Sequence, residues 1–253
     1  MKNFLLNPAE IYELLRAKGV TNLYHANTVT TAQTFIEEDS LLSRYFVEQH
    51  HLEQTAQSTD EMDQTLGLWD DVFLDGFDLH QRSSEPSSFG PVLFVMKLEL
   101  LLRRDLGELS ATRWNPSYWK YHPNWEDRYI MELSELEDHY LAPGVDPARI
   151  VFTFTKSERK ITLSKFLYQI ILDEPYCSIQ NGSNTNFIIT KQVQSALRST
   201  MDRNGLTDIP LILRHASSVK PTCNCTEQYQ KLYTDNLGEF VKRFKPQGYE
   251  FDL

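Results

Sequence analysis

The chain is poor in cysteine, since its 253 residues contain three, at positions 177, 223 and 225. A sparse and odd set cannot build the disulfide framework of a small secreted protein, and it is typical of a reducing compartment. One residue separates Cys223 from Cys225, whereas structural zinc sites usually place about two to four between paired cysteines. The cysteines therefore favour neither a disulfide-stabilised fold nor a zinc site.

Long apolar runs are also missing. No stretch reaches the roughly 18 consecutive apolar residues that a membrane helix needs. The first twenty residues alternate polar and apolar side chains, and Glu10, Glu13, Arg16 and Lys18 interrupt any apolar core of a signal peptide. We therefore expect a cytoplasmic protein that is not exported and has no membrane partner.

The sequence has no excess of basic residues. Its 25 Lys and Arg residues are outnumbered by 35 Asp and Glu, which gives a formal net charge of -10. Proteins that coat nucleic acid carry the opposite sign, because neutralisation of phosphates dominates their affinity. This composition argues against a general nucleic-acid coat, but a local basic patch would still admit nucleic acid as a substrate.

No internal repeat and no long linker divides the chain, so we predict one domain over residues 1–253. Apolar or β-branched stretches predict strands at residues 23–26, 89–96, 150–155 and 209–213. Helical spacing predicts helices near residues 8–18, 30–38, 133–140 and 192–201, while residues 163–172 fit either state. The result is an α+β fold with a mixed, mainly antiparallel central sheet, flanking helices and a tail at residues 215–253.

The residues best suited to chemistry follow the first predicted strand. Tyr24-His25-Ala26-Asn27-Thr28 stands where that strand ends, and Ser43 and Arg44 stand at the close of the next helix. A histidine beside Asn and Thr offers both ring nitrogens and two further hydrogen-bonding groups to a ligand. A guanidinium grips phosphate oxygens in a fixed fork. The set suits a nucleotide with a ribose and a pyrophosphate, although a core histidine and a surface arginine would give the same pattern.

The stretch LYHANTVTTAQTFIEEDSLLSR, residues 23–44, resembles the opening of ADP-ribosyltransferase folds, where a strand carrying His precedes a helix that ends in GLLSR-like sequence. Asp70-Asp71-Val72-Phe73 and then Phe89-Gly90-Pro91-Val92-Leu93-Phe94 stand in an order that resembles the DarT-like branch. Members of that branch are toxins that modify nucleic acid with NAD. The resemblance covers roughly residues 20–100 and implies that this part is the cofactor-binding half.

The resemblance implies an NAD-dependent ADP-ribosyltransferase that consumes NAD as its substrate. His25 and Asn27 would hold the adenosine or the nicotinamide side, Arg44 the pyrophosphate, and Phe89 would stack on the nicotinamide. The full set implied to contact NAD is Tyr24, His25, Asn27, Thr28, Ser43, Arg44 and Phe89. The resemblance also implies a bacterial toxin or anti-phage defence effector, with a nucleic acid or protein acceptor and a cognate antitoxin.

A catalytic glutamate is harder to assign. ADP-ribosyltransferases carry it on a late strand, but the strand predicted at residues 150–155 contains no carboxylate. The nearest candidates are Asp146, Glu158 and Glu174. Glu158 is favoured, because a loop beyond a strand end is a common position for catalytic groups, although it would equally suit a solvated charge. The predicted catalytic set is therefore His25, Arg44 and Glu158.

Two further stretches suggest other functions. In the acidic run at residues 70–80, Asp75, Asp78 and His80 would suit the divalent cation of a metal-dependent nuclease. If this run is extended, Asp75 lies on the opposite face from the other two, so the leading interpretation contains no metal. The aromatic residues 114–125 would stack unpaired bases, bind a partner without catalysis, or form a buried aromatic cluster.

Overall fold

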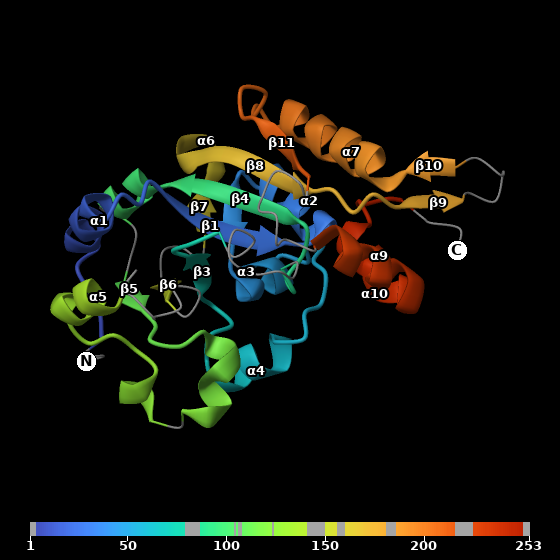
Figure 1. The fold of residues 1–253 in the computed structure, drawn as a ribbon. Helices are drawn as coiled ribbons and strands as arrows, with labels where there is room; N and C mark the ends of the chain where they lie inside the picture. Colours follow the sequence, from blue (N-terminus) through green and yellow to red (C-terminus); the bar gives the residue numbers. More distant parts are fainter. Residues whose placement is uncertain are drawn as a thin grey trace.

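The structure is a computed structural model that describes residues 4–78, 87–103, 105, 108–122, 124–140, 150–155, 160–180, 186–215 and 225–249. A seven-stranded sheet runs through its centre (Figure 1). From edge to edge its strands are β11 (Leu211–Arg214), β8 (Leu167–Asp173), β4 (Val92–Lys97), β1 (Asn22–Asn27), β3 (Val72–Asp75), β6 (Val151–Thr155) and β5 (Glu108–Ala111). Neighbouring strands are antiparallel except β11 and β8, which are parallel. This confirms a single α+β domain with a mixed, mainly antiparallel sheet.

Helices and two small sheets surround the central sheet. The α-helices are α1 (Pro8–Ala17), α2 (Val29–Glu37), α3 (Arg44–Gln49), α4 (Asp60–Thr65), α5 (Leu133–His139), α6 (Leu163–Phe166), α7 (Ile189–Arg203), α9 (Cys225–Asp235) and α10 (Leu237–Phe244). The 3-10 helices are η2 (Leu98–Leu102), η3 (Pro116–Tyr121) and η4 (Trp125–Asp127). The small sheets pair β2 (Ser40–Leu42) with β7 (Lys160–Thr162) and β9 (Ser178–Gln180) with β10 (Asn186–Ile188). Within the described ranges, no helix combines the length and the apolar composition needed to cross a membrane.

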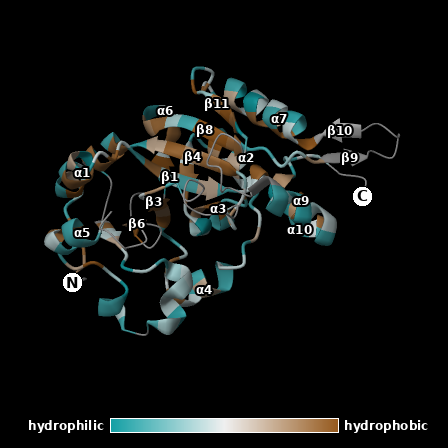
Figure 2. Ribbon diagram, viewed as in Figure 1, coloured by the Kyte–Doolittle hydropathy of each residue, from teal (hydrophilic) through white to brown (hydrophobic). Residues whose placement is uncertain are grey.

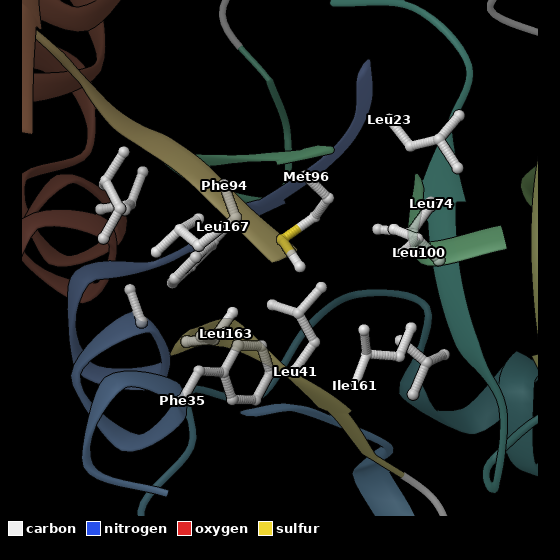
Figure 3. Packing of buried hydrophobic residues seen from close by; sticks show 14 of the residues in the cluster. Leu23, Phe35, Leu41, Leu74, Phe94, Met96, Leu100, Ile161, Leu163 and Leu167 are labelled. Atoms are coloured by element: carbon white, nitrogen blue, oxygen red, sulfur yellow. The ribbon is translucent and has the colours of Figure 1, made fainter. Parts of the chain in front are cut away.

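The core lies between the central sheet and the layer formed by α2, β2 and β7. Residues Val92 to Met96 of β4 are all buried, which is expected for a central strand that is covered on both faces. Figure 3 shows Phe35 of α2 and Leu41 of β2 gathered with Phe94 and Met96 of β4. This packing fixes α2 and β2 against the sheet, and with them the segments that follow β1.

Local signals account for the first helices. Asn7 caps α1, because its Oδ1 accepts a hydrogen bond of 3.0 Å from Ala9 N, and Pro8 occupies the first turn. Thr28 caps α2 in the same way through Thr31 N. The predicted helices at residues 8–18 and 30–38 are confirmed. Residues 163–172, which fitted either state, divide between α6 and β8.

The segment expected to be a tail, residues 215–253, contributes to the core. Its helices α9 and α10 bury Tyr229, Phe240 and Phe244 completely, and Thr30 of α2 donates a hydrogen bond of 2.8 Å to the carbonyl of Lys245. Figure 2 shows the resulting pattern, with mainly apolar strands in the centre and hydrophilic residues along α7, α9 and α10. The local sequence did not indicate this docking, because Thr30 and Lys245 lie 215 residues apart in the chain.

Candidate functional site

A pocket with an empty volume of about 850 Å³, its open mouth included, lies beside the end of β1. The pocket walls come from β1, β3, the start of α3, the segment that contains α4, and the start of η3. The polar and aromatic residues that line it include His25, Asn27, Arg44, Gln57, Asp63, Asp71, Phe73, Asp75, Phe89, Asn115 and Ser117.

The pocket forms where two neighbouring strands part. In the described sheet, β1 and β3 are in register at a single pair, Tyr24 opposite Asp75. Beyond that pair, Nδ1 of His25 lies 2.8 Å from the carbonyl oxygen of Phe73 on β3. A carbonyl can only accept, so Nδ1 carries the proton and donates it. The histidine side chain therefore satisfies a main-chain group at the point where the strands separate.

His25 is neutral at physiological pH. Burial lowers its pKa to about 4, the hydrogen bond to Phe73 opposes this shift, and the positive charge of Arg44 adds to it. With the proton on Nδ1, Nε2 is left as an acceptor. Its neighbour is Nδ2 of Asn27 at 3.4 Å, a long contact that a ligand hydroxyl would readily replace. His25 thus presents Nε2 to the pocket as a hydrogen-bond acceptor.

Asn27 also lines the pocket, and two hydrogen bonds to its side-chain oxygen hold it in place. Its Oδ1 accepts hydrogen bonds from Thr28 N at 2.9 Å and from Gln57 Nε2 at 3.3 Å. Thr28, predicted to contact NAD, is instead buried as the cap of α2 and donates to Thr55 Oγ1 at 2.7 Å. The amide of Asn27 is therefore oriented by a loop that closes over the end of β1.

The sequence suggested that Arg44 ends the helix that follows β1, but the structure shows that it does not. That helix, α2, ends at Glu37, and Arg44 begins α3, with Ser43 as the cap that accepts a hydrogen bond of 3.1 Å from Phe46 N. Arg44 lines the pocket, but its guanidinium is already engaged. Its nitrogens donate to Gln54 Oε1 at 2.7 Å, the Thr55 carbonyl at 3.0 Å and Asp60 Oδ1 at 2.6 Å. In this structure Arg44 holds the segment before α4 against the pocket, and a pyrophosphate would have to share or replace these bonds.

Phe89 reaches the pocket because of the glycine that follows it. Gly90 has φ of 142°, and a Cβ atom built on it would lie 2.3 Å from the carbonyl oxygen of Asn27. Only glycine permits this close approach of two backbone segments. Residues 89–91 therefore cross the end of β1, and the predicted strand at residues 89–96 begins at Val92 instead.

The remaining predicted residues fall outside the pocket or outside the described chain. Tyr24, Thr28 and Ser43 are not among the lining residues. Glu158 and Asp146 lie outside the described residues. Glu174, the third candidate for the catalytic glutamate, is buried and accepts hydrogen bonds from Thr190 Oγ1 and from Tyr176 N at 3.0 Å.

The pocket contains aspartates that the analysis of the sequence did not assign to it. Burial, and after it the nearby charge of Asp78, raises the pKa of Asp75 to about 7. Burial also raises the pKa of Asp63 to about 6, against a hydrogen bond from Thr59. The sequence marked Asp75 as part of an acidic run, but its place in the wall of the pocket depends on the register of β1 and β3.

The predicted metal set is divided. Asp78 forms a buried ion pair of 2.6 Å with Arg214, which also binds Asp173 at 2.7 Å. No group of three His, Cys, Asp or Glu side chains in the described part of the chain is arranged to hold a metal ion. His80 lies outside that part.

The aromatic stretch at residues 114–125 has a buried and an exposed side. Trp119 is buried beside Tyr129, and its Nε1 donates a hydrogen bond of 2.9 Å to the carbonyl of Trp114. Tyr118, Tyr121 and Trp125 are 55%, 68% and 40% exposed. The stretch therefore contains a buried aromatic cluster, and it carries solvent-exposed rings next to Asn115 and Ser117 of the pocket.

No protein-family model matches this chain, and no curated protein matches it either.

Proposed function

We propose that the protein is an NAD-dependent ADP-ribosyltransferase and that the pocket beside the end of β1 is its NAD site. One observation carries the proposal: His25, Asn27, Arg44 and Phe89 come from three separate stretches of sequence and line one pocket.

The chemistry of the lining residues fits the parts of NAD. Nε2 of neutral His25 accepts a hydrogen bond from a ribose hydroxyl, and the amide of Asn27 adds a donor beside it. The ring of Phe89 provides a face for the nicotinamide. Arg44 acts first as the residue that holds the covering segment, and its guanidinium would bind the pyrophosphate by sharing or replacing the bond to Asp60.

The biological role rests on the likeness to the DarT-like branch alone, since a fold or a site does not fix a biological role. We propose a toxin or anti-phage defence effector that modifies a nucleic acid or protein acceptor and is restrained by a cognate antitoxin. Expression in bacteria tests this part. Growth arrest by the wild type, relieved by His25→Asn, is the expected result.

The biochemical test uses the purified full chain with NAD and, separately, with single-stranded DNA, RNA and a cell lysate. Because a ligand that binds only the native state raises its stability, millimolar NAD should raise the melting temperature. Nicotinamide release and transfer of label from NAD should persist in EDTA. If NAD neither binds nor loses nicotinamide, and nucleic acid is instead cleaved in an EDTA-sensitive reaction, the nuclease interpretation based on Asp75, Asp78 and His80 replaces this one.

A further inference from the structure

Asp75 occupies a position between two cavities. It is the last residue of β3 and lines both the main pocket and a small recess on the side of Arg214. The backbone just after it is tightly held, because the Tyr140 hydroxyl donates to the Gly76 carbonyl. A Cβ atom at Gly76 would lie 2.7 Å from that hydroxyl. The carboxyl group of Asp75 is therefore placed by a rigid segment.

The neighbouring carboxylates are neutralised, and that of Asp75 is not. Asp78 and Asp173 share the guanidinium of Arg214, and Asp173 also accepts a hydrogen bond of 3.1 Å from the Tyr229 hydroxyl. Among the described residues, Asp75 has no hydrogen bond and no ion pair. Asp75 is half-buried, so its carboxyl group, without a partner among these residues, remains available to a ligand in the pocket that it lines.

The surroundings of Asp75 set its proton affinity. The titratable and charged groups that face it, or share its two cavities, are Tyr24 and His25 of β1, Arg44 of α3, Asp63 of α4, Asp71, Asp78, Asp173 of β8 and Arg214 of β11. Arg214 is committed to two other carboxylates, and Arg44 to the segment before α4. Burial, followed by the charge of Asp78, raises the pKa of Asp75 to about 7, in the range where a carboxylate is an effective base near neutral pH.

We propose that Asp75 is the general base of the transfer reaction, an assignment that rests on the proposed function. In this step the bond between ribose C1′ and the nicotinamide nitrogen breaks, and its electron pair leaves with neutral nicotinamide. A nucleophilic oxygen or nitrogen of the acceptor bonds to C1′. Its proton passes to the Asp75 carboxylate and from there to solvent. This role differs from that of Glu158, which the resemblance implied would support the departure of nicotinamide.

The test compares Asp75→Asn with Glu158→Gln, using the full chain and an acceptor identified by label transfer. Asp75→Asn should lower kcat by about 100-fold or more, while the rise in melting temperature caused by NAD is retained. Wild-type transfer should increase as pH rises through about 7, because the base must be ionised. Asp202→Asn, on the exposed side of α7, is the matched control and should leave kcat unchanged.

The outcomes separate this assignment from the proposed function. If wild type binds NAD and transfers label, but Asp75→Asn is equally active, or Glu158→Gln alone is inactive, Asp75 is not the base and the proposed function stands. If wild type neither binds NAD nor releases nicotinamide, both are overturned. Should Asp75→Asn fail to fold, the wild-type pH profile decides, and a profile that is flat from pH 6 to 8 overturns the assignment.

Discussion

His25 donates its Nδ1 proton to the carbonyl oxygen of Phe73 across 2.8 Å, and this bond decides which ring nitrogen remains for a ligand. The two residues lie on strands that pair at one position nearby and then part. The same side chain therefore has a structural half and a half that faces the pocket, and substitutions can separate the two.

The first prediction separates the structural role of His25 from its role in the pocket. The amide of His25→Asn can occupy the place of Nδ1 and keep a donor to Phe73, whereas His25→Ala leaves that carbonyl unsatisfied at a cost of about 1–3 kcal/mol. Both variants should lose nicotinamide release, but only His25→Ala should lose that much stability. Urea unfolding and NAD turnover are measured on the same preparations. Full turnover per folded molecule in His25→Asn would remove His25 from the NAD site.

A second prediction concerns Arg44→Lys. Lysine keeps the charge but cannot bind Gln54, Thr55 and Asp60 with one planar group. Since hydrogen bonds to charged groups contribute about 1.5–3 kcal/mol each, the segment before α4 should loosen and NAD affinity should fall. Hydrogen exchange of residues 54–60 and NAD titration provide the measurements. Unchanged hydrogen exchange together with unchanged NAD affinity would show that the planar guanidinium of Arg44 neither holds residues 54–60 nor contributes to NAD binding.

The third prediction concerns stability against pH. The pKa of Asp75 is about 7 in the fold and 3.8 as the reference for an unfolded chain, so the folded state holds the extra proton between these values and stability falls as pH rises. The pKa of His25 moves from 6.5 to about 4, so the unfolded state holds the extra proton and stability falls as pH drops through that window. The two effects oppose each other between about pH 4 and 6.5.

Comparison with Asp75→Asn isolates the aspartate. Its unfolding free energy relative to wild type should increase between pH 4 and 8 by up to about 4 kcal/mol, at roughly 1.4 kcal/mol for each pKa unit. The raised pKa of Asp63 does not disturb this comparison, because that residue is present in both proteins. Urea unfolding curves at both pH values provide the measurement. A constant difference between the two proteins would mean that the pKa of Asp75 is not raised.

The fourth prediction concerns the glycine that brings Phe89 to the pocket. Gly90→Ala places a Cβ atom 2.3 Å from a carbonyl oxygen at a positive φ of 142°, so it should destabilise the protein by more than about 1 kcal/mol and weaken NAD binding. Gly238→Ala in α10 meets its nearest atom at 3.7 Å and should be neutral or stabilising by up to about 1 kcal/mol. Melting curves with and without NAD report both effects, and equal behaviour of the two variants would contradict the role of Gly90.

Much of the secondary structure could be predicted from the sequence, because the residues that begin and end helices and strands act locally. Asn7 before Pro8 marks the start of α1, and the β-branched and aromatic run at residues 150–155 marks β6. The α+β class follows from the order of such elements. The same reasoning identified His25 and Asn27 as polar groups at a strand end, and the structure places both in one pocket.

The tertiary structure decided what local patterns leave open. An alternating strand fits several registers equally well, so the pairing of Tyr24 with Asp75, and hence the place of Asp75 beside the pocket, could not be read from the chain. The packing of the folded chain also decides that α10 docks on α2 and that Arg44 forms an ion pair with Asp60. The sequence by itself indicated many of the helices and strands and the residues available for chemistry. The tertiary structure decided which of those residues meet, because contacts between distant segments arise from the packing of the whole core rather than from the neighbours of any one residue.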